Sequence, residues 1–146
     1  MSHDIIMYPD SIKIAPSKRT PWIILEPGRI FIMGRSIPEN PGEFYQPVFD
    51  WISEYVVKYK GKSIINFGFE YINTSSTKWI YNILKELAGL NEICDNTSVT
   101  WYYEHGDDDM GELGFILRSL VECPFVVVEV NEMGRKKYEQ IFSAQL

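Results

Sequence analysis

The chain has 146 residues, of which 45% are hydrophobic and 14% aromatic, and its 20 acidic and 14 basic residues give a formal net charge of -6. This length corresponds to one domain that can bury a core without metals or disulfides, and the composition excludes a disordered chain. The acidic balance also argues against nucleic acid and acidic membranes as partners, because both would repel the molecule.

No segment of the sequence has the pattern of a targeting or membrane segment. The range 1–13 carries Asp4 and a proline within a short apolar stretch, which is not typical of a signal peptide. No window approaches the roughly 18 unbroken apolar residues that a membrane span needs. Cys94 and Cys123 form no Cys-x-x-Cys pair, so we interpret both as reduced core side chains. These features predict a soluble cytoplasmic protein.

Two kinds of apolar periodicity alternate along the chain. Trp22–Glu26 and Arg29–Met33 are short apolar runs, and the Pro27-Gly28 step between them fits a type II turn, which predicts a hairpin. Further on, spacing of three and four residues predicts helices and alternation of period two predicts strands. The expected elements are a helix from about Phe44 to Tyr59, a strand over Ile65–Tyr71, a helix over Trp79–Leu87, a turn at Asp95-Asn96, a strand over Ser98–Glu104, a helix over Met110–Leu120, a strand over Phe125–Val130 and a short helix over Arg135–Ala144.

This order predicts a single α/β domain over residues 1–146. We expect a STAS-like, mostly parallel sheet of about five strands with an N-terminal β-hairpin, helices mainly on one face and a polar opposite face. The core is expected at about 12–130, followed by a helical C-terminal extension at 131–146. Trp51, Trp79 and Trp101 lie on apolar faces and are predicted to be core residues.

Three polar loops are candidates for a functional site. Ser36–Gly42, Asn73–Ser76 and Glu104–Asp109 each connect the end of a predicted strand to the start of a helix. In parallel βαβ units, such loops lie at the same edge of the sheet, where sites usually form. The sequence therefore predicts that these loops meet.

The loop Asn73–Ser76 offers hydroxyl groups at the start of a helix. N-capping is the commoner role for such residues. The functional alternative is that one hydroxyl accepts a phosphoryl group, because a phosphate there would lie at the positive end of the helix macrodipole. The loop is not a P-loop, since no Gly-x-x-x-x-Gly precedes Thr77-Lys78.

Other candidate chemistry is weaker. Asp107, Asp108 and Asp109 lie near Glu112, but acidic residues also favour the first turn of a helix, and one run does not supply converging metal ligands. We therefore predict no metal and no other cofactor. His3 and His105 show no arrangement with Ser, Cys or carboxylates that is typical of a catalytic unit, so no catalytic residue is predicted.

From about Ile12 to Val130 the chain resembles the SiaC family of bacterial regulatory phosphoproteins, whose fold is like that of STAS-type anti-sigma-factor antagonists. Ile37 stands where the family usually has an aromatic residue, Ile72 where Phe or Leu is common, and the chain after Asn131 is longer than expected. The resemblance rests on Thr20-Pro21, on Ser36-Ile37-Pro38-Glu39-Asn40 followed by Glu43-Phe44-Tyr45-Gln46-Pro47 and Asp50-Trp51, on Glu70-Tyr71-Ile72-Asn73-Thr74-Ser75-Ser76, on Trp101-Tyr102-Tyr103-Glu104, and on Asp108-Asp109-Met110.

The resemblance implies a partner-switching protein rather than an enzyme. In the family, a threonine of the N-T-S-S block is phosphorylated by a dedicated Ser/Thr kinase related to anti-sigma-factor kinases, and a PP2C-type phosphatase reverses the modification. The unphosphorylated form binds and activates a diguanylate cyclase, which promotes biofilm or aggregate formation. Carried over to this sequence, the acceptor is Thr74, and Ser75 and Ser76 rank behind it.

The expected partner surface lies where the three loops meet. A phosphate on Thr74 would change the charge at its centre and repel nearby aspartates. Two alternatives remain open at this point: a small metal-dependent phosphatase or nucleotide hydrolase, and an orphan binding module that keeps the fold without a kinase. The effector is a diguanylate cyclase or another protein. The residues predicted for this surface are Pro38, Glu39, Asn40, Asn73, Thr74, Ser75, Asp107, Asp108 and Asp109.

Overall fold

A six-stranded sheet forms the centre of the computed structural model, which describes residues 9–89 and 97–145. The strands follow one another across the sheet in chain order; the pairs β1·β2 and β2·β3 are antiparallel, and every later pair is parallel. The elements are β1 (Ile12–Ile14), β2 (Trp22–Glu26), β3 (Arg29–Ser36), α1 (Pro41–Lys58), β4 (Ser63–Ile72), α2 (Thr74–Gly89), β5 (Thr97–Glu104), α3 (Asp108–Leu120), β6 (Phe125–Val130) and α4 (Arg135–Ser143).

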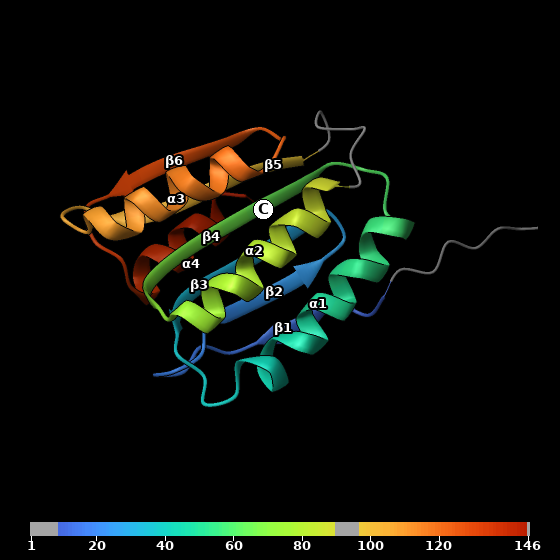
Figure 1. Ribbon diagram of the computed structural model, residues 1–146, viewed down its shortest axis with the longest axis horizontal. Helices are drawn as coiled ribbons and strands as arrows, with labels where there is room; N and C mark the ends of the chain where they lie inside the picture. Colours follow the sequence, from blue (N-terminus) through green and yellow to red (C-terminus); the bar gives the residue numbers. More distant parts are fainter. Residues whose placement is uncertain (1–8, 90–96, 146) are drawn as a thin grey trace, which may run out of the picture.

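The helices cover the two faces of the sheet unequally (Figure 1). α1, α2 and α3 lie on one face, and α4 lies on the other. The first three are crossovers between parallel neighbours, and the right-handedness of such crossovers puts them on the same side of a sheet that grows in one direction. The predicted single α/β domain, with an N-terminal hairpin, a mostly parallel sheet and helices mainly on one face, is confirmed.

The structure adds one strand that the sequence did not predict. β1 pairs with β2 in antiparallel register, with Ile12 opposite Leu25 and Ile14 opposite Ile23. Both isoleucines pack against the core, while Lys13 between them is exposed. An alternation of only three residues is too short to distinguish a strand from a loop, so this edge of the sheet was missed.

The expectation that the face opposite the crossover helices is polar is wrong. Ile24, Phe31 and Met33 of the hairpin point to that face and are buried beneath α4. The hairpin strands are buried on both sides, and such strands show continuous apolar runs rather than alternation. The C-terminal stretch completes this second core with Met133, Tyr138 and Ile141, all at most 8% exposed.

α1 begins earlier than expected. Asn40 caps it by accepting a hydrogen bond from the Glu43 backbone N–H at 3.1 Å, and Pro41 occupies the first turn, where proline is favoured. Pro47 therefore lies inside the helix and not in its first turn. Its missing N–H removes one helical hydrogen bond, yet the residue is exposed and the buried face of α1 is continuous around it.

The main core lies between the sheet and the three crossover helices. Trp101 is fully buried, Trp51 is 5% exposed, and Trp79 is half-buried against the cluster, so all three predicted core tryptophans are confirmed. Cys123 is half-buried against the same cluster. The predictions for His3, Cys94 and the Asp95-Asn96 turn lie outside the described residues. None of the helices within the described ranges is long and apolar enough to cross a membrane.

Close packing of α3 on β5 yields a stability prediction. A Cβ atom at Gly114 would press into the Trp101 indole, whose N–H donates to the Met110 carbonyl at 3.0 Å. We expect Gly114→Ala to lower the free energy of unfolding by about 1 to 3 kcal/mol through overpacking, despite the gain in helix propensity of about 1 kcal/mol. Urea denaturation of the variant measures the change.

Gly42→Ala is the matched control. Its Cβ would lie 3.6 Å from Asn40 Oδ1 and 3.9 Å from Trp79 Cζ2, which is ordinary contact. It should leave stability unchanged or raise it. Equal stability of both variants would show that the α3 and β5 backbones do not approach as closely as described.

Candidate functional site

The carboxyl ends of β3, β4 and β5 lie at one edge of the sheet, because these strands are parallel neighbours. The loop after each strand leads into α1, α2 or α3, respectively. The first two loops are joined directly, since the Asn73 backbone N–H donates to the Ser36 carbonyl at 3.0 Å. The edge that the sequence predicted to be shared by these loops is therefore present in the fold.

The second and third loops enclose a pocket. It has a volume of about 380 Å³ and lies between the start of α2 and the start of α3. Thr74 comes to it from one side, and Asp107 and Asp109 come from the other. The remaining lining residues are Glu70, Tyr71, Ile72, Thr77, Met110 and Leu113. The Thr74 and Thr77 hydroxyls and three carboxylates thus share one small space.

Asn73, not Thr74, caps α2. The Asn73 Oδ1 atom accepts a hydrogen bond from the Ser76 backbone N–H at 2.8 Å, and the Thr77 hydroxyl donates to the Asn73 carbonyl at 3.0 Å. Thr74 and Ser75 are both exposed, whereas Ser76 is fully buried. Within the N-T-S-S block, Asn73 therefore provides the N-cap. Thr74 remains accessible at the positive end of the α2 macrodipole.

In the acidic loop, one aspartate caps α3 and two are exposed. Asp107 caps α3 by accepting from the Met110 backbone N–H at 3.2 Å. Asp108 and Asp109 are exposed in the first turn. Asp109 faces the Thr74 pocket, but Asp108 lines a separate hollow on the other side of α3, together with Tyr103.

The first loop lies beside the pocket without lining it. Pro38 is buried, Asn40 caps α1, and Glu39 pairs with Arg19 at 3.5 Å while remaining exposed. Of the nine residues expected at the partner surface, the structure brings Thr74, Asp107 and Asp109 into one pocket. The others lie around it or, in the case of Asp108, on the far side of α3.

A buried hydroxyl cluster supports the edge from beneath. The Ser36 and Tyr45 hydroxyls lie 2.5 Å apart, and the Ser76 hydroxyl is buried beside them without a hydrogen bond of normal geometry. Burial raises the pKa of the Tyr45 phenol to about 12, and the neighbouring hydroxyls of Ser36 and Ser76 offset this only in part. This cluster links the end of β3, α1 and the start of α2.

Sequence reasoning missed several lining residues of the pocket. Glu70 and Leu113 lie in elements that were predicted, whereas Thr77 lies before the predicted start of the second helix at Trp79, because α2 already begins at Thr74. Which of these side chains meet in the pocket depends on how α2 and α3 are rotated against the end of β4. The only signal was that Glu70 opens the block ending in Ser76. Its carboxylate also accepts a hydrogen bond from the Tyr138 hydroxyl of α4 at 2.8 Å.

The described residues offer no set of converging metal ligands. Within 9–89 and 97–145, no group of three or more His, Cys, Asp and Glu side chains is close enough to hold an ion. His105 is exposed, and its nearest acidic neighbour is Glu129 at 3.4 Å. The pocket therefore provides the accessible Thr74 hydroxyl and negatively charged carboxylates. The described residues show no arrangement typical of a metal-dependent hydrolase.

Comparison with known proteins places these features in a family. The model of the SiaC family of regulatory phosphoproteins matches residues 14–130. An uncharacterised protein of Pseudomonas aeruginosa is 28% identical over 105 residues, which cover 72% of this chain and 83% of that protein. The structure of SiaC of P. aeruginosa superposes with a TM-score of 0.76 at 26% identity, covering 84% of this chain and all of that one.

A second similar structure is a complex. The crystal structure of the diguanylate cyclase SiaD with its activator SiaC, also from P. aeruginosa, matches with a TM-score of 0.74 at 26% identity, covering 82% of this chain and 99% of the matched chain. In that organism, the matched protein activates a diguanylate cyclase.

The raised pKa of Tyr45 predicts a pH dependence of stability. The neutral phenol is favoured in the fold, so its contribution is complete below the ordinary pKa of 10.0 and is lost as the pH rises toward about 12. Relative to Tyr45→Phe, the wild type should lose about 1 kcal/mol of unfolding free energy between pH 9 and pH 11. Chemical denaturation at both pH values measures this loss. A constant difference between the two proteins would contradict the burial of this hydroxyl.

Proposed function

This chain belongs to the SiaC family of regulatory phosphoproteins, and we propose that it activates a diguanylate cyclase under the control of phosphorylation at Thr74. As a member of this family it is a regulatory protein and not an enzyme. The activator role is supported by the SiaC homologue, which forms a complex with the cyclase SiaD.

The observation that carries the proposal is the position of Thr74. It is exposed at the N-terminus of α2 and lines a pocket with Asp107 and Asp109. Ser75 is exposed but does not line the pocket, and Ser76 is fully buried and so cannot meet a kinase in the folded protein. Of the three hydroxyls in the block, only Thr74 is both accessible and placed where added charge alters the surface.

The electrostatics of the pocket explain how such a switch works. A phosphoryl group on Thr74 adds a charge of about -1.5 to -2 at neutral pH. The start of α2 favours this charge, whereas Asp107 and Asp109 across the pocket repel it. The acidic loop is therefore displaced or screened, and a partner that fits the unmodified edge meets a different shape and charge.

The control cycle needs two further partners. We propose a dedicated Ser/Thr kinase and a PP2C-type phosphatase, as the family resemblance implies. Both act on the exposed edge, so kinase, phosphatase and effector compete for one surface. The orphan-module alternative, in which the fold remains but the kinase is lost, makes the opposite prediction about modification in the cell.

Mass spectrometry of protein from the native cell tests for modification. Cleavage after Lys62 and Lys78 releases one peptide, 63–78, that contains Thr74, Ser75 and Ser76. We expect phosphate on Thr74 in at least one growth condition. Phosphate confined to Ser75 would contradict the assignment of the acceptor, and absence of phosphate with an active cognate kinase would favour the orphan module.

Paired substitutions test the role of charge. Thr74→Glu should bind the cyclase at least about tenfold more weakly than Thr74→Ala, because its carboxylate adds charge opposite Asp107 and Asp109. Thr74→Ala should bind like the unmodified wild type. Calorimetric titration with purified cyclase measures both affinities.

Ser75→Glu and Ser75→Ala are the matched controls, because Ser75 is the exposed neighbour outside the pocket. They should differ from each other by much less than the Thr74 pair. If the two Thr74 variants bind the cyclase equally, charge at this position is not the control.

A further inference from the structure

The helix α4 lies beyond the part of the chain that the family model matches, which ends at residue 130. It opens with three consecutive cations, Arg135, Lys136 and Lys137, in a protein with a net charge of -6 and only 14 basic residues. These residues form a local cationic patch on a molecule whose net charge is negative. Its position in the fold determines what it can bind.

Two hydrogen bonds fix the start of α4 at the same sheet edge as the Thr74 pocket. The Tyr138 hydroxyl donates to Glu70 Oε1 at 2.8 Å, and the Met133 backbone N–H donates to Glu104 Oε1 at 2.8 Å. Glu70 also lines the pocket of Thr74, and Glu104 ends the strand before Asp107. The cationic turn of α4 and the acidic pocket therefore lie at one edge, on opposite faces of the sheet.

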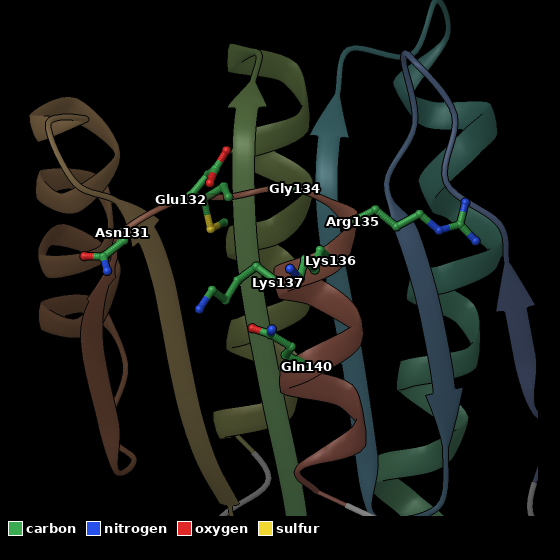
Figure 2. Close-up of a pocket in the computed structure, with 8 residues that line it drawn as sticks. Asn131, Glu132, Gly134, Arg135, Lys136, Lys137 and Gln140 are labelled. Atoms are coloured by element: carbon green, nitrogen blue, oxygen red, sulfur yellow. The ribbon is translucent and has the colours of Figure 1, made fainter.

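A hollow of about 360 Å³ lies beside this turn. Figure 2 shows Lys137 and Gln140 extending from α4 over the neighbouring strand β4, while Arg135 extends in the opposite direction. Glu132 supplies one negative charge to the same hollow. The lining thus carries three cationic side chains against one carboxylate, and the hollow is open at the surface.

Lys136 and Lys137 do not stabilise α4. Positive side chains in a first helical turn oppose the macrodipole, and Gly134 at the N-cap provides no side-chain hydrogen bond. Arg135 is paired with Glu139 at 3.1 Å, but neither Lys136 nor Lys137 forms an ion pair within the described part of the chain. Two unpaired cations that disfavour their own helix are available for a partner.

We propose that Lys136, Lys137 and the hollow beside them bind an acidic segment of the cyclase partner, so that the docking surface continues from the Thr74 pocket around the sheet edge onto α4. This inference rests on the proposed function. The resulting surface is bipolar, with carboxylates on one face and ammonium groups on the other, and it fixes the orientation of a partner with the complementary pattern. Because α4 lies outside the family match, it gives this chain a contact that selects its own effector.

The occupant is a protein segment rather than a free phosphate. A compact dianion in the hollow would meet the Glu132 carboxylate and the negative field of the whole molecule. An extended acidic segment places its carboxylates one by one against Lys136 and Lys137 and keeps them away from Glu132. The spread of the cations along the open hollow fits this occupant better.

Charge reversal at α4 tests the inference. We compare Lys136→Glu/Lys137→Glu with the control Lys13→Glu/Lys62→Glu, which makes the same change in net charge at exposed positions away from α4. Calorimetric titration with purified cyclase should show at least about tenfold weaker binding for the α4 variant and less than about twofold change for the control. Replacing sodium chloride with inorganic phosphate at equal ionic strength should leave wild-type binding unchanged.

The outcomes separate this inference from the proposed function. If both double variants bind the cyclase equally well, the α4 surface is not part of the interface, although the activator role stands. Specific competition by inorganic phosphate would identify an anion site and overturn the acidic-segment assignment. If the wild type does not bind any cyclase, the proposed function fails and the inference fails with it.

Discussion

The parallel pairing of β3, β4 and β5 is the constraint on which the rest of the structure depends. It brings the carboxyl ends of three strands to one edge, so residues more than 60 positions apart in the sequence, such as Ser36 and Asp107, belong to one surface. The hydrogen bond from the Asn73 N–H to the Ser36 carbonyl fastens two of the loops there. Without this pairing, the hydroxyl of Thr74 and the carboxylates of the acidic loop would have no common pocket.

At this edge, the side chain that caps α2 is not the hydroxyl that we propose as the phosphoryl acceptor, whereas Asp107 both caps α3 and lines the pocket. Asn73 and Asp107 satisfy the first backbone N–H groups of their helices, which leaves Thr74 and Asp109 directed to the pocket surface. A phosphoryl group can therefore be added without removing a cap. The phosphorylation that we propose would therefore change the charge balance of the pocket and not the capping of α2, as a reversible switch requires.

Local patterns in the sequence predicted most of the fold. They failed for the second face of the hairpin strands, which are buried on both sides, and for β1, which has only three residues. The periodicity of three to four residues and of two residues located the later helices and strands, and the order of elements fixed the common edge. Phe31 and Met33 of the hairpin are buried under α4; their continuous apolar run is typical of two-sided burial, but it does not show which element covers the second face. For the site, the loops were predictable, but the role of Glu70 depends on the rotation of α2 and α3 and on α4.

Phosphate on Thr74, as we propose, turns off the activation of the cyclase. The most direct test of this proposal is the rate of cyclic di-GMP formation by purified cyclase, titrated with this chain either unmodified or stoichiometrically phosphorylated at Thr74. We expect saturable activation by the unmodified chain and none by the phosphorylated one at equal concentration. Equal activation by both forms would contradict the proposal.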